Sequence, residues 1–414
     1  MNSKKVIVVG AGASGCMAAI TAAKRGLGVT LFDNNPKIGR KLLITGKGRC
    51  NVTNNCDSDT LIASVPTNGR FLYSAFSSFS SKDTMSFFET NGVPLKTERG
   101  NRVFPQSDKS MDIIDALFSQ IRSLYINLVN ESVRELLIED NMVIGVRTDK
   151  AEYRSDSVII CCGGCSYPQT GSDGSGYTLA KQAGHTIIEP IPSLVPIVTN
   201  EDWCAELQGL SLKNVSLKVK NNANKEVYSD FGEMIFTHYG ISGPMVLSAS
   251  SHMNVRKSSD YTITIDLKPA LSEEQLDKRI QKDFGKYINK DIINALDDLL
   301  PKKLIPVAVK LSEIDPHTKC HEITKIQRRR LLSTIKNLTV TFKEFRPIAE
   351  AIVTSGGVKV KEINPKTMES KLVNNLYFAG EVIDVDAYTG GFNLQIAFST
   401  GFLAGSCVLN NNEV

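Results

Sequence analysis

The sequence predicts an α/β fold in which a parallel sheet with covering helices is interrupted by a β-rich insertion. Three observations support this class. The β-branched run 4–9 leads directly into a glycine-rich turn and a helix of small residues. Two further apolar strands that end in glycine lie far downstream, within 157–164 and 375–381. Between these two strands, segments of alternating polarity are typical of antiparallel strands.

The first turn has the spacing of a dinucleotide-binding fingerprint. Gly10, Gly12 and Gly15 form a G-x-G-x-x-G pattern directly after the strand, and Ala13 and Ser14 open the helix. The first glycine permits the tight turn, the second leaves room for a pyrophosphate, and the third allows close packing of helix on strand. The helix N-terminus offers free N–H groups and a positive dipole end to the phosphates.

The second strand, 28–33, ends in an acid. Asp33 lies 21 positions after Gly12, close to the separation of about 20 that is expected for an acid binding the adenosine ribose. An acid at this place, and not an arginine, favours a free 2′-hydroxyl. The pattern therefore predicts FAD or NAD as the dinucleotide, and not NADP.

The later glycine-rich segments favour FAD over NAD. Gly163 and Gly164 end the second of these strands, Gly380 and Glu381 end the third, and Gly391, Phe392 and Asn393 open a final helix. This layout resembles the flavoproteins with two dinucleotide-binding domains. The resemblance implies that the late Gly-Glu pair contacts the ribitol and pyrophosphate of FAD. It also implies that the last helix points its N-terminus at the flavin pyrimidine.

Longer motifs narrow the resemblance. They lie at 39–54, 102–105, 163–171, 236–244 and 354–358. Over nearly its whole length the chain resembles the BaiN-type flavoproteins, a family of bacterial and archaeal NAD(P)/FAD-dependent oxidoreductases. The first motif contributes the remaining expected cofactor-binding residues, which are Arg40, Lys41, Gly46, Arg49, Cys50 and Asn51. One departure is Ala387, where the family often has glycine.

The resemblance also implies a discontinuous domain organisation, which the strand and helix patterns support in outline. A Rossmann-like FAD-binding domain is expected in two parts, with a β-rich substrate domain between them that itself carries a small helical module. The expected parts are 1–190 (FAD-binding), 191–270 (β-rich), 271–335 (helical), 336–347 (β-rich return strand) and 348–414 (FAD-binding).

Two named activities accompany the family, the reduction of ring double bonds in 3-oxo bile acids and the oxidation of aminoacetone by oxygen. The first hypothesis is therefore an NAD(P)H-dependent reductase of an activated C=C bond in a cyclic enone, such as a 3-oxo-4,6-diene bile acid. An amine oxidase of the aminoacetone type and an RNA-associated flavoprotein are the alternatives. NADH or NADPH would bind transiently, because no separate nicotinamide fingerprint is present.

An enone reductase needs a donor that polarises the carbonyl and an acid that protonates the α-carbon. The expected groups on the substrate side are His238, Tyr239, Tyr388 and Arg346, chosen from the neighbourhood of the motifs. Cys162 and Cys165 form a C-x-x-C pair that could act as a redox disulfide. Packing of this turn on the dinucleotide is the favoured interpretation.

Composition indicates an ordinary globular enzyme. The chain is 42% hydrophobic and 22% charged, with a formal net charge of +4 that argues against a nucleic-acid partner. The sequence contains no apolar run of about 18 residues, so no membrane-spanning helix is predicted. Because the sequence begins almost directly with a strand, no secretory leader is expected, and the odd number of nine cysteines favours a reducing cytoplasm. A small-molecule substrate, no membrane partner and no metal site are expected, and the oligomeric state stays open.

Overall fold

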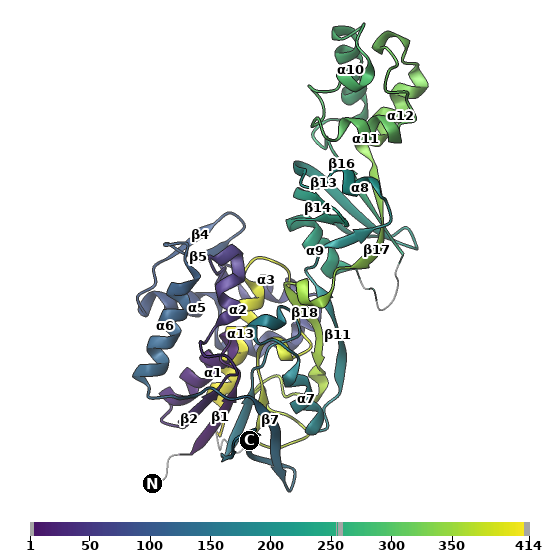
Figure 1. The fold of residues 1–414 in the computed structure, drawn as a ribbon. Helices are drawn as coiled ribbons and strands as arrows, with labels where there is room; N and C mark the ends of the chain where they lie inside the picture. The colour runs from purple at the N-terminus through teal and green to yellow at the C-terminus, as the bar shows by residue number, and fades with distance from the viewer. Residues whose placement is uncertain (1–3, 254, 256–259, 410–414) are drawn as a thin grey trace. The chain divides into compact units, whose positions relative to one another are not determined.

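The computed structural model describes residues 4–253, 255 and 260–409 (Figure 1). Its contacts divide the chain into two compact units. Unit 1 comprises Met1–Ser193 with Pro347–Val414, and unit 2 comprises Leu194–Arg346. Unit 1 is built on a parallel sheet and unit 2 on an antiparallel barrel. The predicted α/β class with an inserted β-rich domain is therefore confirmed.

The central sheet of unit 1 has the strand order β19-β10-β1-β2-β6, and all its neighbouring strands are parallel. Its strands are β1 (Lys5–Val9), β2 (Gly28–Phe32), β6 (Asn127–Val129), β10 (Ser157–Ile160) and β19 (Leu376–Phe378). Nearly continuous burial along β1 and β10 explains why both sequences are β-branched runs without alternation, since helices cover both faces of such sheets. The strands that the sequence predicts at 4–9 and 28–33, and within 157–164 and 375–381, are confirmed as β1, β2, β10 and β19.

Helices and small sheets surround this sheet. The first helix, α1 (Ala13–Lys24), packs against the last, α13 (Phe392–Cys407), although the two are far apart in sequence (Figure 1). The other helical segments are α2 (Arg40–Ile44), η1 (Thr45–Gly48), α3 (Ser58–Ala63), η2 (Gly69–Leu72), α4 (Tyr73–Ser78), α5 (Ser81–Thr90), α6 (Ser110–Ser123), η3 (Pro168–Thr170), α7 (Ser175–Gln182), η6 (Ile348–Glu350), η7 (Val360–Glu362) and η8 (Gly380–Val382).

Three antiparallel sheets complete unit 1, and the sequence did not predict them. The first has the order β3-β5-β4, the second β7-β8-β9, and the third pairs β11 with β18. Their bounds are β3 (Thr53–Asn54), β4 (Leu95–Glu98), β5 (Arg102–Pro105), β7 (Val133–Glu139), β8 (Met142–Thr148), β9 (Glu152–Arg154), β11 (Ile187–Ser193) and β18 (Val353–Val358). Strands β11 and β18 lie next to the two places where the chain leaves and re-enters unit 1.

Unit 2 is a closed barrel with the strand order β12-β15-β14-β13-β16-β17. Its elements are β12 (Ile197–Thr199), α8 (Trp203–Glu206), β13 (Ser211–Asn221), β14 (Glu226–Thr237), β15 (Gly240–Ser242), α9 (Pro244–His252), β16 (Tyr261–Asp266) and β17 (Leu338–Phe345). Strands β13, β16 and β17 correspond to the segments of alternating polarity within the ranges that the sequence predicts to be β-rich. The inward residues Leu217 and Ile265 face each other across the β13–β16 pair and belong to the barrel core.

A helical module lies between β16 and β17. It contains α10 (Glu273–Lys286), η4 (Ile292–Asn294), α11 (Ile305–Leu311), η5 (Cys320–Glu322) and α12 (Lys325–Lys336). Ser272 caps α10, because its hydroxyl accepts from Gln275 N while the side chain of Gln275 accepts from Ser272 N and closes a capping box. Among the described residues of both units, no helix combines the length and the hydropathy that a membrane crossing requires.

Candidate dinucleotide-binding site

The turn between β1 and α1 has the geometry that a bound pyrophosphate requires. A Cβ on Gly12 would meet no atom within 4 Å, so the space in front of this residue is open. A Cβ on Gly15 would overlap the carbonyl oxygen of Gly10, so only glycine permits this helix to pack so closely on the strand. No side chain caps α1 at Gly12, which leaves the N–H groups at Ala13 and Ser14 available for an anion.

Asp33 holds the same turn from the end of β2. Its Oδ2 accepts a hydrogen bond from Ala11 N at 2.6 Å, and its Oδ1 accepts from Asn35 N at 2.7 Å and Asn35 Nδ2 at 3.0 Å. An ionised carboxylate offers about four acceptor sites. The structure therefore gives Asp33 a second task, which is to brace the glycine turn, and leaves it capacity for a ribose hydroxyl.

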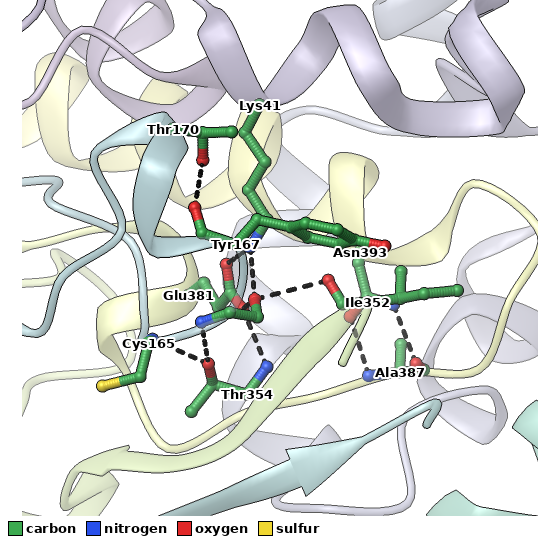
Figure 2. A network of polar contacts seen from close by, with 10 residues as sticks. Lys41, Cys165, Tyr167, Thr170, Ile352, Thr354, Glu381, Ala387 and Asn393 are labelled. Atoms are coloured by element: carbon green, nitrogen blue, oxygen red, sulfur yellow. Dashed lines mark hydrogen bonds and ion pairs between the residues drawn. The ribbon is translucent and has the colours of Figure 1, made fainter. Parts of the chain in front are cut away.

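A polar network joins four segments of unit 1, which are α2, the turn that contains Ser166, η8 and β18 (Figure 2). Lys41 Nζ on α2 donates to Glu381 Oε2 on η8 at 2.7 Å and to Ser166 Oγ at 2.6 Å. Ser166 Oγ donates in turn to Glu381 Oε1 at 3.0 Å, which also accepts from Thr354 N on β18 at 2.8 Å. Lys41 and Glu381, both predicted cofactor-binding residues, are thus brought together.

Glu381 stays ionised in this network. Burial alone would raise its pKa, but the ammonium group of Lys41 and the hydrogen bonds from Thr354 and Ser166 together hold the pKa below its usual value. The side chains of Lys41 and Glu381 keep only 24% and 20% of their surface exposed. A carboxylate and an ammonium group are therefore fixed a few ångströms apart and partly shielded from water.

The predicted turn residues Gly163 and Gly164 lie beside the same network. A Cβ on Gly163 would lie 2.8 Å from Ser172 Oγ, and one on Gly164 would overlap Thr354 Oγ1. That hydroxyl accepts hydrogen bonds from Cys165 N at 2.8 Å and Ser166 N at 3.2 Å, which fixes the path of the turn (Figure 2).

The two cysteines of this turn are free thiols. Burial raises the pKa of Cys162 to about 12 and also raises the pKa of Cys165. Because redox and nucleophilic cysteines need a lowered pKa, the geometry supports packing and not thiol chemistry. Cys50, in the motif 39–54, is buried as well, and burial raises its pKa to about 12.

The basic residues of the motif 39–54 have different surroundings. Arg40 donates to Asn35 Oδ1 at 2.6 Å and is exposed. Arg49 pairs with Glu98 at 2.9 Å and Asp108 at 3.2 Å, and its guanidinium lies 4.0 Å from the ring centroid of Phe104. Arg49 is thus held by protein groups, whereas Lys41 lies within the network.

Gly46 and Asn51, two more predicted residues of the motif 39–54, contribute to the site in different ways. Gly46 adopts a left-handed conformation with φ 57°, where a Cβ would lie 3.0 Å from Asn51 N. The Oδ1 of Asn51 is buried without a hydrogen-bond partner in the protein. Buried acceptors of this kind are normally satisfied, so Asn51 fits a donor on a bound molecule.

The start of α13 is shaped by its neighbours in unit 1. Gly391 has φ 97°, and a Cβ there would overlap the backbone carbonyl of Thr53. The side chain of Asn393 receives a hydrogen bond from Ala387 N at 2.9 Å and donates to Ala387 O at 2.8 Å (Figure 2). Phe392, half-buried, packs on the core of unit 1. No side chain caps this helix, so its first N–H groups remain available.

Asn393 fixes the loop that contains Ala387, the residue that departs from the family pattern. Ala387 is fully buried. Its methyl group is therefore accommodated inside unit 1.

The four predicted substrate-side residues belong to different units. In unit 2, Arg346 lies over the ring of Tyr239 at 4.6 Å, and His238 contacts the same ring edge-on with centroids 4.8 Å apart. His238 is exposed, whereas Tyr239 and Arg346 are half-buried. Tyr388 belongs to unit 1, where burial and the charge of Asp386 raise its pKa.

Sequence patterns missed several residues of this site. Ser166 and Thr354 complete the network around Glu381 and lie in the motifs 163–171 and 354–358, but neither was predicted as a site residue. Gln395 is fully buried on α13, accepts from Thr53 Oγ1 at 2.6 Å and donates to the Phe79 carbonyl at 3.0 Å. A polar residue within an apolar helix was the only indication of its role.

These features define a Rossmann-type dinucleotide-binding protein of the flavoenzyme class. The chain belongs to the family described as "HI0933-like protein Rossmann domain", whose model matches residues 4–407. Together with the relatives below, this match confirms the predicted resemblance.

Two curated relatives match almost the whole chain. A 3-dehydro-bile acid delta(4,6)-reductase of Clostridium scindens is 32% identical over 407 residues, which cover 97% of this chain and 98% of that protein. A ribosomal RNA dihydrouridine synthase of Haemophilus influenzae is 31% identical over 410 residues, or 98% of this chain and 97% of that protein.

A solved structure shares the architecture. The 3-ketosteroid delta1-dehydrogenase from Sterolibacterium denitrificans superposes with a TM-score of 0.52 at 14% identity, and 99% of each chain is covered. At this identity the likeness concerns the fold alone.

Proposed function

We propose that the protein is a FAD-dependent oxidoreductase that reduces a C=C bond conjugated to a carbonyl group. The observation that carries the cofactor assignment is the open cradle in front of Gly12, at the uncapped start of α1 and beside the carboxylate of Asp33. Bound FAD supplies hydride transfer through its isoalloxazine ring. The protein supplies position, charge and a proton.

The residues of unit 1 divide this work. The N–H groups at Ala13 and Ser14 hold the pyrophosphate, and Asp33 accepts from the ribose. Glu381, kept ionised by Lys41, accepts hydroxyl donors of the ribitol. The uncapped N-terminus of α13 at Gly391 stabilises negative charge on the flavin pyrimidine. The same site is shaped or lined by the other predicted residues of these segments, which are Arg40, Gly46, Arg49, Cys50, Asn51, Gly163 and Gly164.

The two relatives favour an enone-like substrate. A 3-oxo-delta(4,6) steroid carries its double bonds in conjugation with the 3-carbonyl group. Dihydrouridine differs from uridine by two hydrogens across a bond that is conjugated to a ring carbonyl. The named activities therefore share one reaction type, in which hydride adds to the carbon of a conjugated C=C bond that is farther from the carbonyl and a proton to the nearer carbon. A cyclic enone of bile-acid type is our first candidate.

Tyr388 is the proposed proton donor. A tyrosine phenol is protonated near neutral pH at its ordinary pKa of about 10, and the raised pKa of Tyr388 leaves it so, which a proton donor requires. The chain offers His238, Tyr239 and Arg346 as candidate groups for polarising the carbonyl. The guanidinium of Arg346 over the Tyr239 ring would favour developing negative charge on an oxygen.

The experiment mixes the FAD-loaded protein with NADH or NADPH without oxygen and follows bleaching of the flavin absorbance. Fast bleaching, followed by reoxidation with a 3-oxo-4,6-diene bile acid, supports the proposal. Bleaching by aminoacetone and reoxidation only by oxygen would instead establish the amine oxidase. A protein that binds no FAD would overturn the cofactor assignment as well.

A second candidate, formation of dihydrouridine in ribosomal RNA, is favoured by the charge distribution. The helical segment 271–336 contains 14 lysines and arginines against 10 acids, whereas the rest of the chain contains 34 of each. The whole net charge of +4 thus lies in one module. Four cationic residues on α10 and α12 are exposed, namely Lys278, Lys282, Lys325 and Arg329. Phosphate contacts are made by such surfaces.

The two candidates are separated by a competition. Reduced protein is offered the bile acid or protein-free ribosomal RNA, and dihydrouridine is measured by mass spectrometry of the digested RNA. Dihydrouridine formation that weakens with salt, and weakens further in Lys325→Glu/Arg329→Glu, would establish the RNA activity. Unchanged RNA with rapid bile-acid turnover would exclude it.

A further inference from the structure

Helix α6 of unit 1 has two apolar faces, and only one of them is buried in the protein. Ile113, Leu117 and Ile121 are buried, and the helix packs against α1 and α2. The other face carries Met111 and Phe118, which are 46% and 40% exposed. Single exposed apolar residues are ordinary, but a repeated stripe on one helix is not.

The stripe continues past the end of the helix. Tyr125 follows α6 with φ 54° and is 94% exposed. Met111 and Phe118 are seven residues apart, the repeat with which a helix presents one seam to a partner helix, and Tyr125 follows at the same spacing just beyond the end of α6.

Two opposite charges lie within this stripe. Asp115 and Arg122 are exposed and fall between the apolar residues. In the part of the chain that the structure describes, neither takes part in a salt bridge. Together with Phe118, Ser119 and Ser123, they line a shallow surface hollow.

The order of these residues is self-complementary. When two copies of α6 lie antiparallel with a twofold axis between Phe118 and Ser119, Asp115 of one copy faces Arg122 of the other. The same operation brings Met111 within one position of Tyr125, because the midpoint of Met111 and Tyr125 lies only half a residue from that axis. A twofold interface requires this reciprocity, in which one surface patch meets itself.

We propose that the α6 face, defined as Met111, Asp115, Phe118, Arg122 and Tyr125, is the interface of a twofold symmetric homodimer. The occupant is a second copy of this chain, since the charge order matches its own reverse. The apolar residues supply burial, and the two Asp115–Arg122 pairs fix the antiparallel register. This interface is independent of the redox chemistry and lies wholly on unit 1.

The test uses charge reversal on the full-length protein. Asp115→Arg places arginine opposite arginine twice, and Arg122→Asp places aspartate opposite aspartate twice. Each single variant should weaken dimerisation roughly tenfold or more. The double variant Asp115→Arg/Arg122→Asp, and an equal mixture of the two single variants, should both recover it, because every contact is again between opposite charges.

Sedimentation equilibrium between about 1 and 100 μM measures the dissociation constants. Glu89→Arg on α5 is the matched control, because it makes the same charge change at an exposed site outside the α6 face and should leave dimerisation unchanged. Phe118→Asp should give a monomer with an unchanged circular dichroism spectrum.

Three results would overturn the proposal. They are a wild-type chain that stays monomeric over the whole concentration range, a dimer that none of Asp115→Arg, Arg122→Asp and Phe118→Asp weakens, and a mixture of the two charge-reversal single variants that fails to associate. The last result would mean that the two charges do not face each other across a twofold axis.

Discussion

The carboxylate of Asp33 has two roles. It accepts a hydrogen bond from Ala11 N, which stabilises the glycine turn, and it can still accept a hydrogen bond from a ribose hydroxyl. We expect Asp33→Ala to weaken FAD binding roughly ten- to a hundredfold, since losing a partner of a charged hydrogen bond costs about 1.5–3 kcal/mol. Quenching of FAD fluorescence on titration measures the affinity.

Asp33→Asn is the matched control for this change. The amide keeps one oxygen that can accept from Ala11 N but removes the charge, so its affinity should fall between those of the wild type and Asp33→Ala. Equal affinities for all three proteins would mean that the acid contacts neither the turn nor the ligand to any useful extent.

His185 predicts a pH dependence of stability. Its side chain is fully buried, with Nε2 2.8 Å from Ser370 Oγ and Nδ1 3.4 Å from Glu362 Oε2. Burial lowers its pKa below 6.5, although Glu362 opposes this shift. Between the lowered pKa of His185 in the folded state and its ordinary pKa of 6.5 in the unfolded state, the folded protein therefore binds fewer protons than the unfolded chain. The stability contribution of His185 is complete above pH 6.5 and is lost as the pH falls below it.

Urea unfolding at several pH values between about 4.5 and 8 checks this expectation. His185→Gln keeps a polar group at Ser370 but does not titrate, so the variant should be less stable overall and should have a flatter pH profile. A profile as steep as that of the wild type would assign the pH dependence to other groups.

The ion pair of Lys41 and Glu381 joins α2 to η8, and Thr354 adds β18 to the same network. We expect Lys41→Met to destabilise unit 1 by about 2 kcal/mol, because it leaves a shielded carboxylate without its cation. Adding Glu381→Gln to this variant should recover part of the loss, since no unpaired charge then remains.

Thermal unfolding of the two variants, with the exposed Lys37→Met as the control, measures the coupling. The lowered pKa of Glu381 also fixes the direction in which the stability of the fold changes with pH. Its contribution is present above the usual value of 4.5 and is lost as the pH falls through the lowered pKa. In Lys41→Met this loss should begin at a higher pH.

The start of α13 depends on Gly391. Gly391→Ala puts a methyl group onto the backbone of Thr53 at a φ of 97°, so we expect a loss of roughly 2 kcal/mol or more and poorer FAD retention. Gly285→Ala is the matched control, because that glycine lies in α10 with open space around its Cβ and should be neutral or stabilising. Equal unfolding temperatures for the two variants would contradict the close approach.

Sequence predicts best the elements whose determinants are local. The fingerprint at Gly10 and the capping box at Ser272 each lie within a few residues, so spacing alone identifies them. Ser166, Thr354 and Glu381 meet across separations of up to 215 residues, and no periodicity encodes such a meeting. Closure of the six-stranded barrel depends likewise on pairings such as β12 with β17 that only the folded chain creates.

The family motifs showed which segments contribute to the site but not which side chains are already held by the protein. Arg40 and Arg49 were predicted together as cofactor-binding residues, yet Arg49 lies between two acids and an aromatic ring. Lys41, one position after Arg40, is the cation that reaches Glu381. Helical geometry separates neighbours by about 100° around the axis, so adjacent basic residues face different surroundings.

At the scale of the whole molecule, the chain consists of two units with separate hydrophobic cores. All the proposed cofactor-binding residues belong to unit 1. We therefore expect two unfolding transitions in calorimetry, only one of which responds to FAD, because a ligand stabilises the part that binds it. A hundredfold excess over the dissociation constant contributes about 2.7 kcal/mol, or roughly 5–10 °C for a unit of this size.

Asp33→Ala tests the assignment of that transition, because it should reduce the FAD-dependent shift of unit 1 and leave the other transition in place. Leu217→Ala, a core substitution in the barrel, should do the opposite. It lowers the FAD-independent transition by creating a cavity at a fully buried site and leaves the FAD-dependent shift intact. If a single cooperative transition responds to both variants and to FAD, the two units stabilise each other, and binding in unit 1 is coupled to the barrel.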